Sequence, residues 1–122
     1  MATREIPQEE WIDFLDGFSR RHERWLATVQ VLGDLGAQTE ADSLPLGGVT
    51  ADRHAPHAIT VLLQDSSGGA VAHSVPSPSR LLVEEREGSE RALEIESKEG
   101  EKTILSFRSA PPPEDVNGIL PP

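Results

Sequence analysis

A single amphipathic helix followed by a series of short alternating strands is the feature that most constrains this fold. Between Pro7 and about Trp25, large apolar side chains recur every three or four residues, which is the period of one helix face. From Leu26 to Arg108 the period changes to two, and turn-forming residues interrupt it at short intervals. A lone helix beside a sheet must cover one face or one end of it. The pattern therefore predicts an α+β protein.

The helical segment supplies most of the large apolar side chains of a chain in which only 4% of the residues are aromatic. Pro7 suits the first helical position, where its missing N–H costs nothing. Acidic residues come early in the segment and arginines come late, an order that complements the helix dipole. The apolar stripe consists of Trp11, Phe14, Leu15, Phe18, His22 and Trp25. We expect this stripe to pack on the sheet, with His22 as a packing residue near the helix C-terminus.

The strands are predicted from period-two alternation bounded by Gly, Pro, Asn, Asp and Ser. Their approximate ranges are 27–31, 37–42, 49–52, 59–63, 71–75, 81–86, 93–95 and 104–108. Pro45 and the glycines after it require a bend or bulge, because proline cannot donate to a central ladder. So many short strands should curl strongly. We expect the helix to pack on a strongly curved antiparallel meander sheet, or a small open β-barrel, of about 6–8 strands.

The chain has 122 residues, which favours one domain. We place this domain at residues 1–108. Residues 109–122 are rich in proline and poor in large apolar side chains. They are expected to form an extended, mobile tail, with Pro111 to Pro113 as an alternative polyproline II ligand for another protein.

The net charge of −10 and the pI of about 4.7 argue against nucleic acid and anionic membranes as partners, because both are bound through basic surfaces. The longest apolar run, Ala58 to Leu63, is too short to span a bilayer. Cysteine is absent, so the chain has neither a disulfide nor a thiolate nucleophile. The N-terminus lacks the basic start and apolar stretch of a signal peptide. We therefore expect a cytoplasmic protein.

Three histidines are candidates for chemistry. His54 and His57 lie close together in a loop and could share a metal ion with Asp52 or Asp65, although exposed loop histidines are usually only solvated. His73 shares a strand face with apolar residues, which fits a general base in a barrel mouth or a half-buried structural histidine. No pattern predicts a cofactor or a metal site strongly enough, so none is expected.

Two clusters of charge offer further candidates. Arg20, Arg21 and Arg24 form the densest basic cluster, which is suited to a phosphate or an acidic partner, or simply to a solvated helix end. Glu94 and Glu96 alternate with apolar residues and should share one sheet face. Paired carboxylates serve acid–base catalysis or bind hard cations, but more often form the wet face of a hairpin.

Several patches of the sequence, taken in order, are similar to a known family. They are Ile6-Pro7, Trp11, Phe14, Phe18-Ser19, His22, Trp25, Thr28 to Gly33, Gly36 to Gln38, Leu44 to Leu46 and Ala92 to Ser97. Together they resemble a family of short bacterial proteins known only as a domain of unknown function. The resemblance implies a bacterial, cytoplasmic protein and supplies no activity, cofactor or site residue.

Three functional classes follow from the sequence. A non-enzymatic binding or accessory, regulatory module is favoured, because the chain offers a scaffold without a catalytic constellation. Its partner would be an unknown protein or small molecule, and it would be a monomer or a homodimer, the latter through edge strands. The alternatives are a small barrel enzyme with a His/carboxylate site and an Sm-like or OB-like nucleic-acid binder, which the acidity disfavours.

Overall fold

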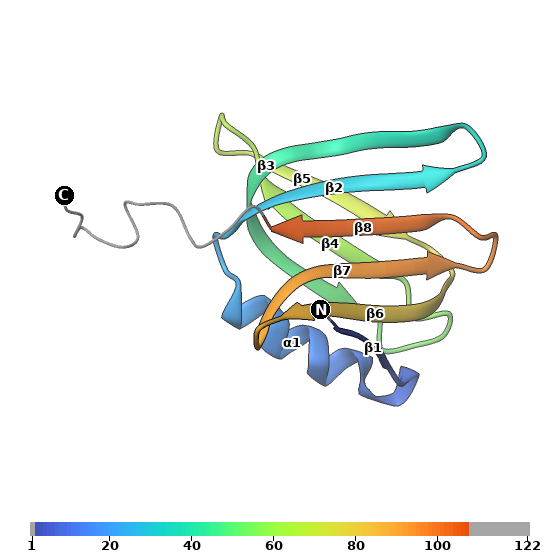
Figure 1. Cartoon of the computed structure of the whole chain (residues 1–122). Helices are drawn as coiled ribbons and strands as arrows, with labels where there is room; N and C mark the ends of the chain where they lie inside the picture. The colour runs from blue at the N-terminus through green and yellow to red at the C-terminus, as the bar shows by residue number, and fades with distance from the viewer. Residues whose placement is uncertain (1, 108–122) are drawn as a thin grey trace.

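The computed structural model describes residues 2–107 (Figure 1). The proline-rich tail predicted at 109–122 lies outside these described residues. The helical segments are a 3₁₀ turn, η1 (Gln8–Glu10), and α1 (Trp11–Arg21). The strands are β1 (Ala2–Ile6), β2 (Leu26–Gly33), β3 (Gly36–Ala51), β4 (Ile59–Gln64), β5 (Ala70–Val75), β6 (Pro78–Arg86), β7 (Ser89–Ser97) and β8 (Lys102–Phe107).

The eight strands form one antiparallel sheet with the order β1-β6-β7-β8-β2-β3-β4-β5. Two meanders, β2 to β5 and β6 to β8, are joined because β8 pairs with β2, and β1 adds to β6. The two end strands, β1 and β5, do not pair, so the sheet is not closed. These observations confirm the predicted α+β fold, with one N-terminal helix on an open antiparallel sheet of the expected size.

Strand β3 bends the sheet. Its first half pairs with β2, and its second half, from Leu46 onward, pairs with β4. A register shift between Leu46 and Gly48 marks the bulge that Pro45 and the glycines predict. The prediction of two separate strands at 37–42 and 49–52 is therefore wrong, because the bulge bends one long strand without ending it. A Cβ atom at Gly47 would lie 3.3 Å from the carbonyl oxygen of Leu62, so glycine allows this close approach.

Helix α1 lies against β3, and its apolar stripe enters the core. Trp11, Leu15 and Phe18 are buried. Ser19 fixes the contact, because its Oγ donates to the carbonyl oxygen of Val49 at 3.0 Å and accepts from the Val49 N–H at 2.8 Å. The core between helix and sheet also contains Ile6, Ala27, Val29, Ala41, Leu46, Val49, Ile59, Val61, Leu63, Val75, Leu81, Val83, Leu93, Ile95, Leu105 and Phe107.

The helix ends earlier than predicted. Periodicity extends it to about Trp25, but α1 ends at Arg21 and His22 caps it. Arg24 has a φ of 71°, a left-handed conformation that turns the chain out of the helix. The Arg24 N–H then donates to the carbonyl oxygen of Leu46 at 2.8 Å. Pairing with β3 therefore replaces the last helical turn, while Trp25 still packs on the core.

Strand β1 was not predicted, because its sequence shows no apolar alternation. It pairs with β6 from Ala2↔Glu85 to Ile6↔Leu81. The buried Trp11 indole N–H donates to the carbonyl oxygen of Ile6 at 2.9 Å, which ties the end of β1 to the start of α1. No helix within the described residues is both long and apolar enough to cross a membrane.

Candidate functional site

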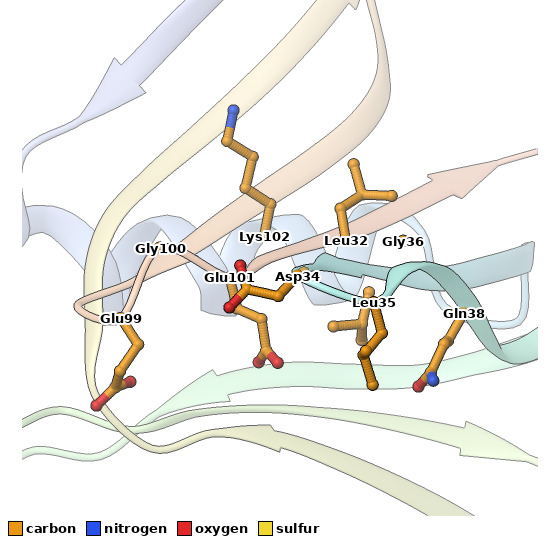
Figure 2. A pocket seen from close by; sticks show the side chains of 11 residues that line it. Leu32, Asp34, Leu35, Gly36, Gln38, Glu99, Gly100, Glu101 and Lys102 are labelled. Atoms are coloured by element: carbon orange, nitrogen blue, oxygen red, sulfur yellow. The ribbon is translucent and has the colours of Figure 1, made fainter.

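A cavity of about 800 Å³ lies at the tips of two neighbouring hairpins, β2–β3 and β7–β8 (Figure 2). Smaller cavities of about 350 and 300 Å³ lie beside η1 and between β6, β7 and β8. The residues that line the large cavity are Val31, Leu32, Gly33, Asp34, Leu35, Gly36, Gln38, Glu99, Gly100, Glu101 and Lys102. This combination of a concave surface with apolar and charged groups makes it the best candidate binding site in the described chain.

Strand pairing and two glycines place these residues together. Leu32 of β2 pairs with Lys102 of β8, so the two hairpin tips are neighbours. Gly36 and Gly100 have φ angles of 96° and 95°, which only glycine adopts easily, and each closes its turn. The side chain of Glu101 lies over Gly33, where an added Cβ would be 3.3 Å from the Glu101 Cγ.

The cavity carries unneutralised negative charge. Among the described residues, Asp34, Glu99 and Glu101 have no ion pair. The Lys102 ammonium Nζ lies 3.8 and 3.9 Å from the carboxylates of Glu94 and Glu96 on β7, two residues that do not line the cavity. Figure 2 shows Lys102 projecting to the opposite side of the ribbons from Glu99 and Glu101. A cationic group in this cavity would therefore meet three carboxylates, while the ammonium of Lys102 is paired with Glu94 and Glu96.

An apolar side chain also faces solvent here. Leu35, at the tip of the β2–β3 hairpin, is 89% exposed, the largest exposure among the large hydrophobic residues of the described chain. In Figure 2 its side chain projects to the same side as Gln38 and Glu101. An isolated exposed leucine is ordinary, but a leucine beside a cavity offers a ligand an apolar contact in addition to the carboxylates.

His73 faces inward from β5, half-buried, with its Nε2 3.3 Å from the hydroxyl Oγ1 of Thr103 on β8. Within the described residues no carboxylate hydrogen-bonds to this imidazole. His73 is thus half-buried, as predicted for a structural histidine, and within residues 2–107 its imidazole is not hydrogen-bonded to an acid.

His54 and His57 occupy the loop between β3 and β4. The His57 Nδ1 lies 2.9 Å from the carbonyl oxygen of Asp52, and the His57 N–H donates to the carbonyl oxygen of His54 at 2.8 Å. Within residues 2–107, no group of three or more potential metal-binding side chains is placed to hold an ion. These contacts fit a structured loop.

The three arginines of the basic cluster lie on two segments, and the guanidinium groups of Arg20 and Arg21 both lie within 4.0 Å of where a Cβ at Gly17 would be. Arg20 and Arg21 end α1, whereas Arg24 lies beyond it in the left-handed conformation. Arg21 makes two hydrogen bonds to the Glu90 carboxylate of β7, at 2.9 and 3.0 Å. The guanidinium of Arg21 is therefore paired with a carboxylate within the fold.

His22 forms a buried polar contact that the sequence does not reveal. Its Nδ1 lies 2.8 Å from the carbonyl oxygen of Phe18, and its Nε2 lies 3.4 Å from Glu90 Oε1. The ring stacks on Phe107 with centroids 4.7 Å apart. Burial lowers the pKa of His22 below its ordinary value, although the Phe18 carbonyl and the Glu90 carboxylate act in the opposite direction. The position of His22 in the packed stripe is as predicted.

Glu94 and Glu96 lie on one sheet face, as predicted, where Lys102 contacts both and Arg80 contacts Glu96 at 3.5 Å. Burial raises the pKa of Glu94, and a hydrogen bond with Glu96 raises it further. Arg80 also contacts Glu5 of β1 at 3.1 Å. The two carboxylates thus belong to an ion-pair network that links β1, β6, β7 and β8. This network lies on the solvent-facing side expected of a half-buried hairpin.

The residues of the cavity were not singled out by sequence patterns. The segments around Asp34 and Glu99 are recognisable only as turns, and their proximity depends on the pairing of β2 with β8. The one available signal is Leu35, a large apolar residue in the middle of a turn sequence.

Fold and site together define an α+β protein with one helix on an open antiparallel sheet and a cavity at its hairpin tips. The chain belongs to a family of unknown function, DUF5335, whose model matches residues 2–116. An uncharacterized protein of Aquifex aeolicus (strain VF5) is 27% identical over 113 residues, covering 92% of this chain and 97% of the relative. No solved structure matches the chain. The resemblance to a bacterial family of unknown function is thereby confirmed.

Proposed function

We propose that this protein is a non-enzymatic binding module and that the hairpin-tip cavity receives a basic segment of a partner protein. The observation that carries the proposal is a set of three carboxylates without an ion pair among residues 2–107, those of Asp34, Glu99 and Glu101, around a cavity of about 800 Å³. Lysine or arginine side chains complement these carboxylates, and Leu35 offers a contact for an apolar neighbour in the same segment.

The charge of the whole chain supports the same class of partner. A net charge of −10 attracts cationic proteins over distance and repels nucleic acid and anionic membranes. Catalysis is not part of the proposal, because within the described residues no carboxylate hydrogen-bonds to His73 to orient its imidazole as a base for the Thr103 hydroxyl. A cytoplasmic location is part of the proposal, and the absence of cysteine is compatible with that reducing compartment.

Titration with a blocked peptide of alternating lysine and leucine, followed by two-dimensional NMR at low salt, tests the proposal. We expect shifts of the amide signals at Asp34, Leu35 and Glu99 to Lys102, and loss of these shifts at high salt, because screening weakens exposed ion pairs. The same peptide with glutamate in place of lysine is the ligand control and should produce no shifts.

Variants then locate the site. The triple variant Asp34→Asn, Glu99→Gln, Glu101→Gln should bind the lysine peptide about 3- to 150-fold more weakly, since each lost ion pair contributes about 0.2–1 kcal/mol. Glu87→Gln, at the tip of the separate β6–β7 hairpin, removes a like charge elsewhere and should leave affinity unchanged. No binding by the unmodified protein, or equal weakening by the triple variant and Glu87→Gln, would refute the proposed site.

A further inference from the structure

Strands β4 and β5 contain no charged residue, although the chain has 21 acidic and 11 basic residues. Burial explains the absence of charge only for the side chains that point inward from each strand. The outward side chains are at least partly exposed, and they are also uncharged. We call this surface the neutral face, and it consists of Thr60, Leu62, Gln64, Ala70, Ala72 and Ser74. Leu62, near its middle, is 40% exposed.

Among the described strands, the neutral face ends at a sheet edge, β5, that carries none of the usual blocking groups. Free edges are normally blocked by charges, proline or bulges, because their unpaired main-chain groups invite another strand. Edge strand β1 carries Arg4 and Glu5, which form ion pairs with β6. Residues 36–45 of β3, which pair with β2 alone, carry Glu40 and Asp42 and face two register shifts. Strand β5 has no charge, no proline and six consecutive pairs with β4 without a shift.

The hydrogen-bond pattern shows which groups of β5 point outward. The Asp65 N–H donates to the carbonyl oxygen of Gly69 at 2.9 Å, so this pair closes the β4–β5 hairpin. Because hydrogen-bonded and non-hydrogen-bonded pairs alternate in an antiparallel ladder, the main-chain groups of Val71 and His73 point to β4. The N–H and C=O groups of Ala70, Ala72 and Ser74 then point away from the sheet.

We propose that β5 is an interface for a second copy of this chain, paired antiparallel about a two-fold axis near Ala72. An antiparallel edge is self-complementary under such an axis, which is the commonest symmetry of homodimers. Two copies that each carry a charge of −10 repel one another, so an uncharged surface is where they approach with least electrostatic cost. Leu62 lies directly opposite Ala72 in the β4–β5 ladder, so pairing would place Leu62 and Ala72 of both copies in one apolar row.

The size of this interface predicts a weak dimer. The outward groups of Ala70, Ala72 and Ser74 in two copies allow about six inter-chain hydrogen bonds. At about one hydrogen bond per 100–200 Å², such an interface buries about 600–1,200 Å², the range of transient complexes. We therefore expect dissociation in the micromolar range. This surface is distinct from the hairpin-tip cavity, so the inference does not depend on the proposed function.

Sedimentation velocity between about 1 and about 500 μM tests the inference, because this range spans a micromolar dissociation constant. The unmodified chain should shift from monomer to dimer as its concentration rises. Ala72→Glu, which places like charges near the axis, and Ala72→Pro, which removes one outward N–H without breaking the β4 ladder, should each weaken dimerisation at least tenfold. Ala37→Glu, the same change at an exposed alanine of β3, is the matched control and should dimerise normally.

Amide hydrogen exchange identifies the surface independently of the variants. The amides of Ala70, Ala72 and Ser74 should exchange more slowly in concentrated than in dilute samples, and those of β1 should not change. Circular dichroism checks that each variant is folded. A chain that stays monomeric over the whole range, or a dimer that both Ala72 variants leave intact, would overturn the inference.

Discussion

Replacing Phe18 by alanine tests whether the helix stripe holds the core together. Phe18 is fully buried on α1, and its ring lies 5.8 Å from that of Phe107 and 4.4 Å from that of His22, measured between centroids. Truncation removes most of the ring from a site whose walls belong to both helix and sheet, so the cavity cannot collapse easily. Phe→Ala changes at such sites cost about 3–5 kcal/mol. A domain of this size has a stability of about 6–18 kcal/mol, so the loss is a large fraction.

Urea unfolding followed by tryptophan fluorescence measures this loss, with Phe14→Ala as the matched control. Phe14 lies one turn earlier on the same helix but is only partly buried. Its truncation should cost about 1–2 kcal/mol, because less apolar area returns to water. A change below about 1 kcal/mol for Phe18→Ala, or equal losses for the two variants, would show that the Phe18 side of α1 does not hold the core.

Three further predictions concern polar contacts of α1. Because folding lowers the pKa of His22, the unfolded chain binds a proton more tightly than the folded chain. The free energy of unfolding should therefore fall as the pH drops below about 6.5, by at most about 1.4 kcal/mol per pH unit. His22→Gln should flatten this pH dependence in unfolding curves. Ser19→Ala leaves the Val49 N–H without its partner and should cost about 1–2 kcal/mol in urea unfolding, whereas Ser19→Thr retains a hydroxyl and should cost less. Trp11→Phe removes the buried indole hydrogen bond to β1 and should cost about 1–3 kcal/mol, with faster amide exchange in β1 as its specific sign.

The parts of the fold that were predictable are those in which side-chain period and burial agree. Strands β4, β5 and β8 combine a clear period with turn residues at both ends, so their predicted ranges nearly match the structure, and the buried side of the helix is that of the predicted stripe. The end of α1 could not be predicted, because Trp25 continues the helical period although the chain has already left the helix. Its exit depends on a main-chain hydrogen bond between Arg24 and Leu46, a contact between segments that no local pattern encodes.

The candidate site was hidden for a similar reason. Asp34 and Glu101 are 67 positions apart (101 − 34), and they become neighbours only because β8 pairs with β2 across the junction of two meanders. Each hairpin alone shows an ordinary turn with a glycine. The sequence predicted candidate sites at histidines and arginines because these residues are chemically versatile. In the structure, however, His57 and Arg21 make hydrogen bonds within the fold.

The placement of charge on the outer surface separates the proposed dimer edge from the rest of the sheet. Strand β7 also buries alternate residues from Leu93 to Ser97, and between them it carries Glu94 and Glu96. The inward residues of β5, Val71, His73 and Val75, are partly or fully buried, and its outward residues are small and uncharged. Folding alone tolerates charge at such positions, as β7 demonstrates. Charge is the simplest protection against edge pairing, and β5 is the described edge strand that lacks it. Pairing of two copies through β5 therefore accounts both for the charge on β7 and for its absence on β5.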